Sequence, residues 1–260
     1  MFNTEKIIKQ QARQALRGNL SQLIAAAGSV VTVYLAVQYA NYMVYFSLKN
    51  LDVTQIGLLS AETLFALGTA VMLLLCSPLL NGFLRASANT ALQKDCGARD
   101  VFFYFKKTEL YFKTLLINLL VYMLFSITST ALNVSMYLEK LAPSVTDPAV
   151  FGFTPQGFAV VFAAVLTVII SIFLYMFFVH FPLMSYALNE NQGVGRCVFV
   201  TMGFSFRNFG KLLRLMLSFA GWFALCFFVL PILYVLPYFS VASLLSARWL
   251  FDLDESRGAV

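Results

Sequence analysis

Long apolar segments alternate with short polar segments along this chain of 260 residues. Each apolar segment has at least about the 20 residues that a helix needs to cross a bilayer. The pattern predicts an all-α, polytopic transmembrane helical bundle that forms one integral membrane domain, residues 1–260. Its six spans are expected near residues 20–46, 63–84, 115–137, 158–188, 212–230 and 232–251.

Prolines fall within or beside several of these segments. Pro78 predicts a kink near one end of the second span, and Pro182 interrupts the long fourth segment. Pro231 and Pro237 predict a short break between the fifth and sixth spans. The sixth span has the weakest pattern, because Pro237 and small residues such as Ser240 interrupt its apolar run.

Residues 1–19 predict an amphipathic helix, with basic side chains on one side and apolar side chains such as Ile8 and Leu16 on the other. Such a helix is typical of a segment that lies on a membrane surface. Its basic residues are Lys6, Lys9, Arg13 and Arg17.

The charge pattern predicts one orientation. Only 12% of the residues are charged and 60% are hydrophobic, whereas soluble domains carry about 25% charge. All 18 basic residues except Lys49 and Lys140 fall at the chain ends or in every second gap between spans. The positive-inside rule therefore places both termini in the cytoplasm. Because the basic residues are divided among several loops, nucleic-acid binding is not expected.

Basic stretches precede three of the spans, at residues 7–16, 101–112 and 199–209, and the second and third are also rich in aromatic residues. They suggest three repeated units, each an interfacial helix followed by a helical hairpin. The alternative is that any protein with an even number of spans and basic inner loops shows this pattern.

We expect the basic and aromatic side chains of these stretches at the lipid interface, with rings at the acyl boundary and cations among the phosphates of anionic lipids. The candidates are Lys6, Lys9, Arg13, Arg17, Phe102, Phe105, Lys106, Lys107, Phe112, Lys113, Arg207 and Lys211.

The single histidine, His180, lies in an apolar stretch. It is a candidate proton-handling group, or else a neutral histidine that bonds to a neighbouring helix. Ser218, Gly221 and Trp222 predict a packing knot in the fifth span, in which Trp222 fills the space opposite Gly221. A ligand pocket there is the alternative.

The sequence offers no catalytic constellation. It has one histidine, no acidic residue at the centre of a span, and four cysteines, none in a CxxC pair. Paired catalytic groups and metal sites require more of these residue types. We therefore expect no enzyme activity, no metal and no cofactor.

Five short segments carry a family resemblance: PLLNG at 78–82, VFFYF at 101–105, YALNEN at 186–191, LSFAGW at 217–222 and LPY at 236–238. Together they resemble the bacterial membrane family called domain of unknown function 975. The resemblance implies a multi-pass protein of the bacterial inner membrane and supplies no activity or catalytic residue. The chain has VLP at 229–231 where the family tends to have a glycine-rich turn. The further candidate functional or packing residues are Pro78, Gly82, Pro237 and Tyr238.

Two functions remain after these exclusions. The first is a non-enzymatic, accessory membrane protein that binds lipid or a partner protein through its basic, aromatic segments. The second is a small transporter or channel for an uncharged or amphipathic solute, which the hairpin repeat and the proline-broken ends favour.

Overall fold

The computed structural model describes residues 4–50, 55–56, 59–131, 174–225 and 231–258, together with isolated positions between 162 and 171. These residues are almost entirely helical, which confirms the predicted all-α class. Four helical segments in the described part are long and apolar enough to cross a membrane. They are Leu20–Ser47, Thr63–Ala91, Thr108–Thr128 and Ile232–Phe251. The structure does not confirm six spans or a three-unit repeat.

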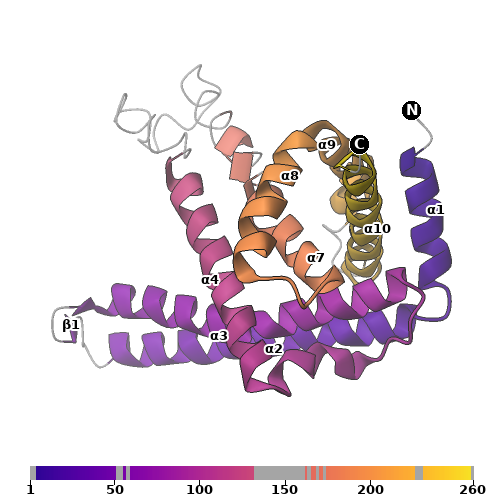
Figure 1. Ribbon diagram of the computed structural model, residues 1–260. Coiled ribbons are helices and arrows are strands. Elements are labelled where there is room, and N and C mark those ends of the chain that lie inside the picture. The colour runs from indigo at the N-terminus through magenta and orange to yellow at the C-terminus, as the bar shows by residue number, and fades with distance from the viewer. Residues whose placement is uncertain are drawn as a thin grey trace.

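The longest feature is an antiparallel hairpin of two helices, α2 (Leu20–Asn50) and α3 (Ala61–Ala91) (Figure 1). Two short paired strands, β1 (Gln55–Ile56) and β2 (Leu59–Ser60), stand between the helices at the tip. The Ser60 side chain accepts a hydrogen bond from the Thr63 amide, which caps the start of α3.

Helix α3 continues beyond the predicted end of its span at residue 84 and reaches Ala91. Its second half contains alanine, serine and asparagine, and the helix continues because these small side chains let it pack closely on neighbouring elements. Pro78 lies inside the helix, which is assigned as continuous on both sides of it.

The basic loop after α3 forms a 3₁₀-helix, η1 (Ala98–Phe105), and not a long surface α-helix. Gly97 precedes it, and the Gly97 amide donates to the Asp100 carboxylate at 3.1 Å, which closes the first turn. Helix α4 (Thr108–Ala131) follows and starts seven residues before the predicted span. Residues 132–137 of that predicted span lie outside the described residues.

Part of the predicted fourth span, including residues 158–161, also lies outside the described residues. Its last part is a π-helix, η4 (Met176–His180), which runs directly into α7 (Phe181–Leu188). Pro182 therefore does not end the helix. It stands at the start of α7, where the change from π to α geometry accommodates its missing N–H.

The next elements are a second π-helix, η5 (Arg196–Val200), α8 (Thr201–Arg207) and α9 (Phe209–Leu225). Residues 226–230 of the predicted fifth span are not among the described residues. Helix α10 (Ile232–Gly258) starts directly after Pro231 and runs through Pro237, so the predicted break is confined to the segment before Ile232. Pro237 is the sixth residue of α10, where it removes one backbone hydrogen bond without ending the helix.

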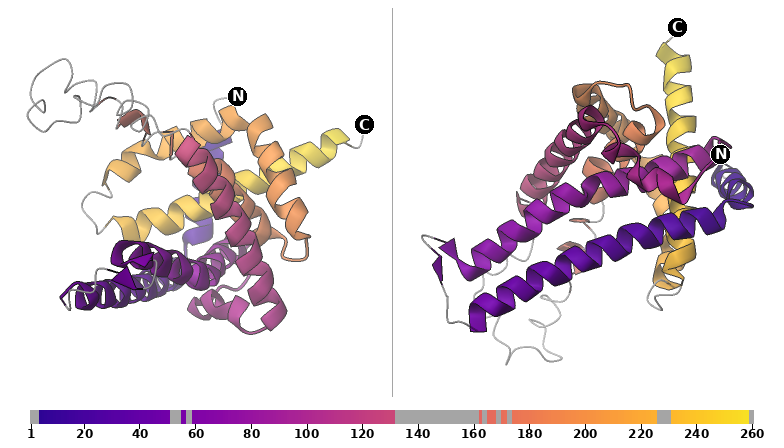
Figure 2. Two further views of the ribbon diagram at one scale, coloured as in Figure 1. Left: turned by 90° about the vertical axis from the view of Figure 1, so that its left-hand side faces the viewer. Right: turned by 90° about the horizontal axis from the view of Figure 1, so that it is seen from below.

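The long helices do not run parallel to one another. Helices α2 and α3 lie side by side, whereas α10 lies crosswise against one end of that hairpin (Figure 2). This is the end opposite the β1–β2 tip, and we call it the inner end of the hairpin. Helices that cross a bilayer together stay within a moderate tilt of its normal. The hairpin and α10 therefore do not both run along one membrane normal in this arrangement.

Burial is concentrated at the inner end of the hairpin, where α3, η1, α7 and α10 meet. Large side chains such as Tyr104, Tyr186 and Tyr238 are fully buried there. The N-terminal helix α1 (Thr4–Leu16) lies beside α10 and buries Ile8 and Leu16 (Figure 1).

Candidate functional site

The five segments that carry the family resemblance pack in two groups. In the first, Gly82 of α3 lies directly under η1: a Cβ atom at this position would stand 2.0 Å from the Val101 carbonyl oxygen. No side chain fits in that gap, so Gly82 is the residue that lets the two backbones touch. The predicted packing role of Gly82 is located here, and Pro78 is buried one turn before it.

Tyr104 and Tyr186 continue this group. Their rings stack at 5.5 Å between centroids, and the Tyr186 hydroxyl lies 3.2 Å from that of Thr114 on α4. Burial raises the pKa of the Tyr104 phenol far above its ordinary value, so this phenol stays neutral.

An ion pair ties the same elements to the turn after α7. Arg85 of α3 pairs with Glu190, and its guanidinium lies over the Phe103 ring of η1. Lys113 of α4 donates to the Glu190 backbone carbonyl at 2.6 Å. Lys113, which we expected at the lipid interface, is therefore engaged with the protein instead.

The outer side of η1 and the start of α4 form a surface that we call the basic–aromatic edge. Its aromatic members are strongly exposed, with Phe112 at 62%. On the opposite side of η1, Val101 and Tyr104 are fully buried and anchor the segment. The edge consists of Phe102, Phe105, Lys106, Lys107 and Phe112, all of which we predicted as interface residues.

The second group joins α9, α10 and α1. Trp222 packs on Tyr234 and Tyr238 of α10, with centroids 5.8 Å and 5.9 Å apart. Tyr238 is fully buried, and Pro237 beside it is buried too. Gly221 corrects one expectation: it is exposed, and among the described residues nothing lies within 4 Å of a Cβ placed there. Trp222 therefore packs against α10 and does not fill a space opposite Gly221.

Helix α1 is docked on this group, which also corrects part of the prediction. Lys9 donates to the Ser218 carbonyl, and its ammonium lies 4.5 Å from the Phe219 ring centroid. The Arg13 guanidinium lies 5.7 Å from the centroid of the Tyr238 ring. Burial lowers the pKa of the Lys9 ammonium. Two of the four basic residues thus hold α1 on the protein, while Lys6 and Arg17 remain exposed.

His180 ends the π-helix η4 and is buried. Its imidazole stacks on Phe239 of α10 at 5.3 Å with an interplanar angle of 17°. Within the described part of the chain, its Nε2 atom has no hydrogen-bond partner. The geometry therefore shows aromatic packing for His180, with one polar atom left unbonded in the core.

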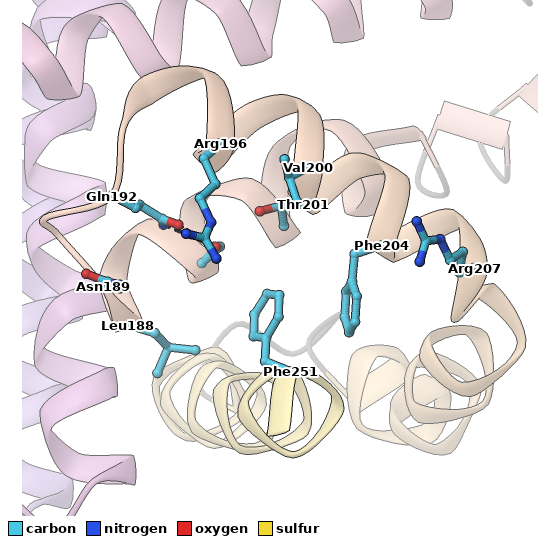
Figure 3. Close-up of a pocket in the computed structure, with 10 residues that line it drawn as sticks. Leu188, Asn189, Gln192, Arg196, Val200, Thr201, Phe204, Arg207 and Phe251 are labelled. Atoms are coloured by element: carbon cyan, nitrogen blue, oxygen red, sulfur yellow. Dashed lines mark hydrogen bonds between the residues drawn. The ribbon is translucent and has the colours of Figure 1, made fainter. Parts of the chain in front are cut away.

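A pocket of 270 Å³ opens between the turn after α7, η5, α8 and α10. Arg196 and Phe251 reach into it from opposite sides, and Arg207 stands at one end (Figure 3). We call it the Arg196–Arg207 pocket. Its lining residues are Ser185, Leu188, Asn189, Gln192, Arg196, Val200, Thr201, Phe204, Arg207 and Phe251.

A second pocket of 380 Å³ lies between α1, α9 and α10 and also includes Arg207. Two of its cations already have protein partners. The Lys211 ammonium donates to the Asn208 side-chain carbonyl at 3.2 Å and lies 5.5 Å from the centroid of the Trp249 ring. Arg214 pairs with Glu5 at 3.4 Å.

Cysteine chemistry is suppressed near the first pocket. The Cys197 thiol is fully buried and donates to the Pro182 carbonyl at 3.3 Å. Burial raises the pKa of this thiol to about 12. Across the part of the chain that the structure describes, no three His, Cys, Asp or Glu side chains gather as a possible metal site.

No family model, curated protein or solved structure matches the chain. The resemblance to domain of unknown function 975 therefore stays a prediction. What the structure adds is contact: it brings residues 78–82, 101–105 and 186–191 together, and likewise 217–222 and 236–238.

Sequence reasoning did not single out the Arg85–Glu190 pair or the Arg196–Arg207 pocket. One signal was available for the pair. Glu190 is the single acidic residue between Asp147 and Asp252, and an isolated charge beside a long apolar run needs a partner. No comparable signal pointed to the pocket, because it closes only when Phe251 of α10 packs against residues 185–207.

Proposed function

We propose that this chain is a non-enzymatic membrane protein that binds anionic lipid through its basic–aromatic edge. The observation that carries the proposal is the two-sided character of η1. Val101 and Tyr104 fix one side in the core, while Phe102 and Phe105 leave large apolar rings exposed beside Lys106 and Lys107.

Exposed phenylalanines next to lysines fit the boundary between acyl chains and headgroups. Each ring that enters the boundary removes apolar area from water. Each cation near an anionic leaflet contributes about 1 kcal/mol. Because Gly82 seats η1 directly on α3, the edge is held in a fixed position relative to the apolar hairpin.

The topology belongs to the same proposal. We place the protein in the inner membrane of a bacterium, with six spans and cytoplasmic termini, on the basis of the charge pattern and the family resemblance. The exposed outer half of the hairpin supports lipid contact there: Leu35, Tyr39, Leu67 and Val71 all face outward. The crosswise position of α10 means that the full set of spans requires a different relative orientation of α10 and the hairpin.

The test uses full-length protein in lipid nanodiscs. Phe105→Trp is introduced together with Trp222→Phe and Trp249→Phe, so that one reporter remains. We expect quenching by bromine-labelled phospholipid, stronger in anionic than in zwitterionic discs, and a weaker charge dependence after Lys106→Gln and Lys107→Gln. A reporter that only aqueous iodide quenches would contradict lipid binding and would favour a partner protein at the edge.

A transporter is a second candidate because several buried polar atoms lack partners among the described residues. They belong to side chains of the core, including Asn81, Ser87, Tyr104 and Asn118. Such atoms are costly unless water or a ligand reaches them. Solute uptake into proteoliposomes that is lost on Asn81→Leu and Asn118→Leu would support transport.

A further inference from the structure

The Arg196–Arg207 pocket carries two cations without protein partners. Among the described residues, neither guanidinium makes an ion pair or hydrogen bond. By contrast, Arg85 pairs with Glu190 and Arg214 pairs with Glu5. No acidic side chain is among the residues that line the pocket. The pocket therefore has a net positive charge, which favours the binding of an anion.

Because both cations are guanidinium groups, they favour some classes of anion over others. A guanidinium presents a planar fork of donors that matches the oxygens of a phosphate, often in a bidentate arrangement. Neutral donors stand around the same space, including the side chains of Asn189, Gln192 and Thr201. Gln192 is held in place because its amide nitrogen donates to the Ser185 hydroxyl at 3.1 Å.

The local backbone directs Arg196 toward the space. Arg196 is the first residue of the π-helix η5, and such turns often occur at functional sites because they change the direction of side chains. Figure 3 shows its side chain entering the pocket from the side opposite Phe251.

The other wall of the pocket is apolar. The Phe204 and Phe251 rings stack at 4.7 Å with an interplanar angle of 22°, and the apolar side chains of Leu188 and Val200 also line the pocket. A free inorganic anion does not use such a wall. An anion joined to a carbon chain does, since the chain removes apolar surface from water there.

We propose that the Arg196–Arg207 pocket binds the phosphate of an amphiphilic phosphate ester, with Arg196 on the phosphate and Phe204 and Phe251 on the attached carbon chain. Arg207, at the end of the pocket, adds positive charge that favours the anion. A phospholipid headgroup and a soluble phosphate ester share this chemistry. The assignment to a membrane lipid rests on the proposed function, whereas the assignment to a phosphate does not.

The experiment titrates full-length protein in neutral detergent with three probes: dihexanoyl phosphatidic acid, glycerol 3-phosphate and dihexanoyl phosphatidylcholine. Binding is followed by calorimetry. We expect phosphatidic acid to bind best. Arg196→Gln combined with Arg207→Gln is expected to weaken it about tenfold or more, because each charged hydrogen bond contributes more than a neutral one. The matched control is Arg99→Gln, an exposed arginine outside the pocket, which is expected to bind as the unaltered chain does.

A variant that keeps the charge guards against misfolding. Arg196→Lys retains the cation and loses the bidentate fork, so we expect an intermediate loss with an unchanged elution profile. Equal binding of phosphatidic acid by the double variant and the unaltered chain would overturn the proposal, as would no binding to either.

The remaining outcomes separate the two possible sources. Glycerol 3-phosphate that binds as tightly as phosphatidic acid, with the same arginine dependence, would overturn the contact with the carbon chain and identify a soluble ester. Loss of lipid quenching at the basic–aromatic edge with intact phosphatidic acid binding would overturn the proposed function alone, because Arg196 and Arg207 are not part of that edge.

Discussion

The two halves of α3 belong to one apolar helix, yet they have opposite surroundings. In the first half, Leu67, Val71, Met72 and Leu75 are exposed. In the second half, nearly every side chain from Ser77 to Ala91 is buried against η1, α7, α10 and the inner end of α2.

Both the size and the polarity of the side chains separate the halves. The exposed half is rich in leucine, which suits lipid chains. The buried half contains Asn81, Gly82, Ala86, Ser87 and Ala88, small or polar residues that allow backbones to approach and bond. A single helix thus has an exposed apolar end, which we propose faces lipid, and a second end that belongs to the core.

The largest expected effect is at Gly82. We predict that Gly82→Ala sharply lowers the thermal unfolding midpoint in detergent. Overpacking typically reduces the free energy of unfolding by about 1–3 kcal/mol, and we expect a loss at or above the upper end of that range. The reason is that a Cβ would stand 2.0 Å from the Val101 carbonyl oxygen, which belongs to the backbone and cannot rotate away.

The control for this substitution lies in α2. Nothing stands within 4 Å of a Cβ at Gly28 among the described residues, so Gly28→Ala is expected to leave the midpoint unchanged or raise it slightly. Equal midpoints for the two variants would show that η1 does not sit on α3 as described.

The next effect is at Arg85 and Glu190, whose side chains are 21% and 23% exposed. A double-mutant cycle with Arg85→Gln and Glu190→Gln is expected to give a coupling free energy of about 2 kcal/mol. The reason is that removing either charge leaves the other charge partly buried and without its partner. Chemical unfolding in detergent measures it. A coupling near zero would mean that the pair does not join α3 to the turn after α7.

A smaller effect is expected in the exposed half of the hairpin. Asn41 of α2 donates to the Thr69 hydroxyl at 2.7 Å and to the Phe65 carbonyl at 3.3 Å. Polar contacts between membrane helices contribute about 0.6 kcal/mol on average. Asn41→Leu should therefore cost far less than Gly82→Ala in the same thermal assay. A larger loss than at Gly82 would reverse the order of the two halves.

The smallest expected signal is chemical. With its pKa raised to about 12, the Cys197 thiol has a thiolate fraction of about 10⁻⁴ at pH 8. We predict that maleimide at pH 8 labels Cys197 only after denaturation, as peptide mass spectrometry would show. Lys107→Cys, on the exposed edge, is the reactive control. Rapid native labelling of Cys197 would contradict its burial.

The sequence predicted the helical class and the position of the hairpin, because apolar runs of this length have few other solutions. It misplaced the end of α3, since the residues after Leu84 become hidden only when η1 and α10 cover them. It also assigned Lys9 and Lys113 to lipid. Amphipathicity shows that one side of a helix is basic, but it does not distinguish a lipid phosphate from a protein carbonyl as the partner.

The candidate site was predictable to the same degree. The exposed members of the basic–aromatic edge were visible as a local pattern of rings and lysines. The Arg85–Glu190 pair joins residues 105 positions apart, and the Arg196–Arg207 pocket needs Phe251 against residues 185–207. No local pattern in one sequence encodes such pairing.

Spin labels compare the hairpin and the edge in one experiment. Single cysteines replace Leu67, Val71, Phe105 and Lys107 in a chain without native cysteines, and oxygen and a water-soluble nickel complex serve as relaxation agents in anionic nanodiscs. We predict strong oxygen and weak nickel relaxation at Leu67 and Val71, and contributions from both agents at Phe105 and Lys107, as at a membrane interface. Strong nickel relaxation at Leu67 and Val71 would place the exposed half of the hairpin in water and contradict the lipid-facing assignment on which the proposed function depends.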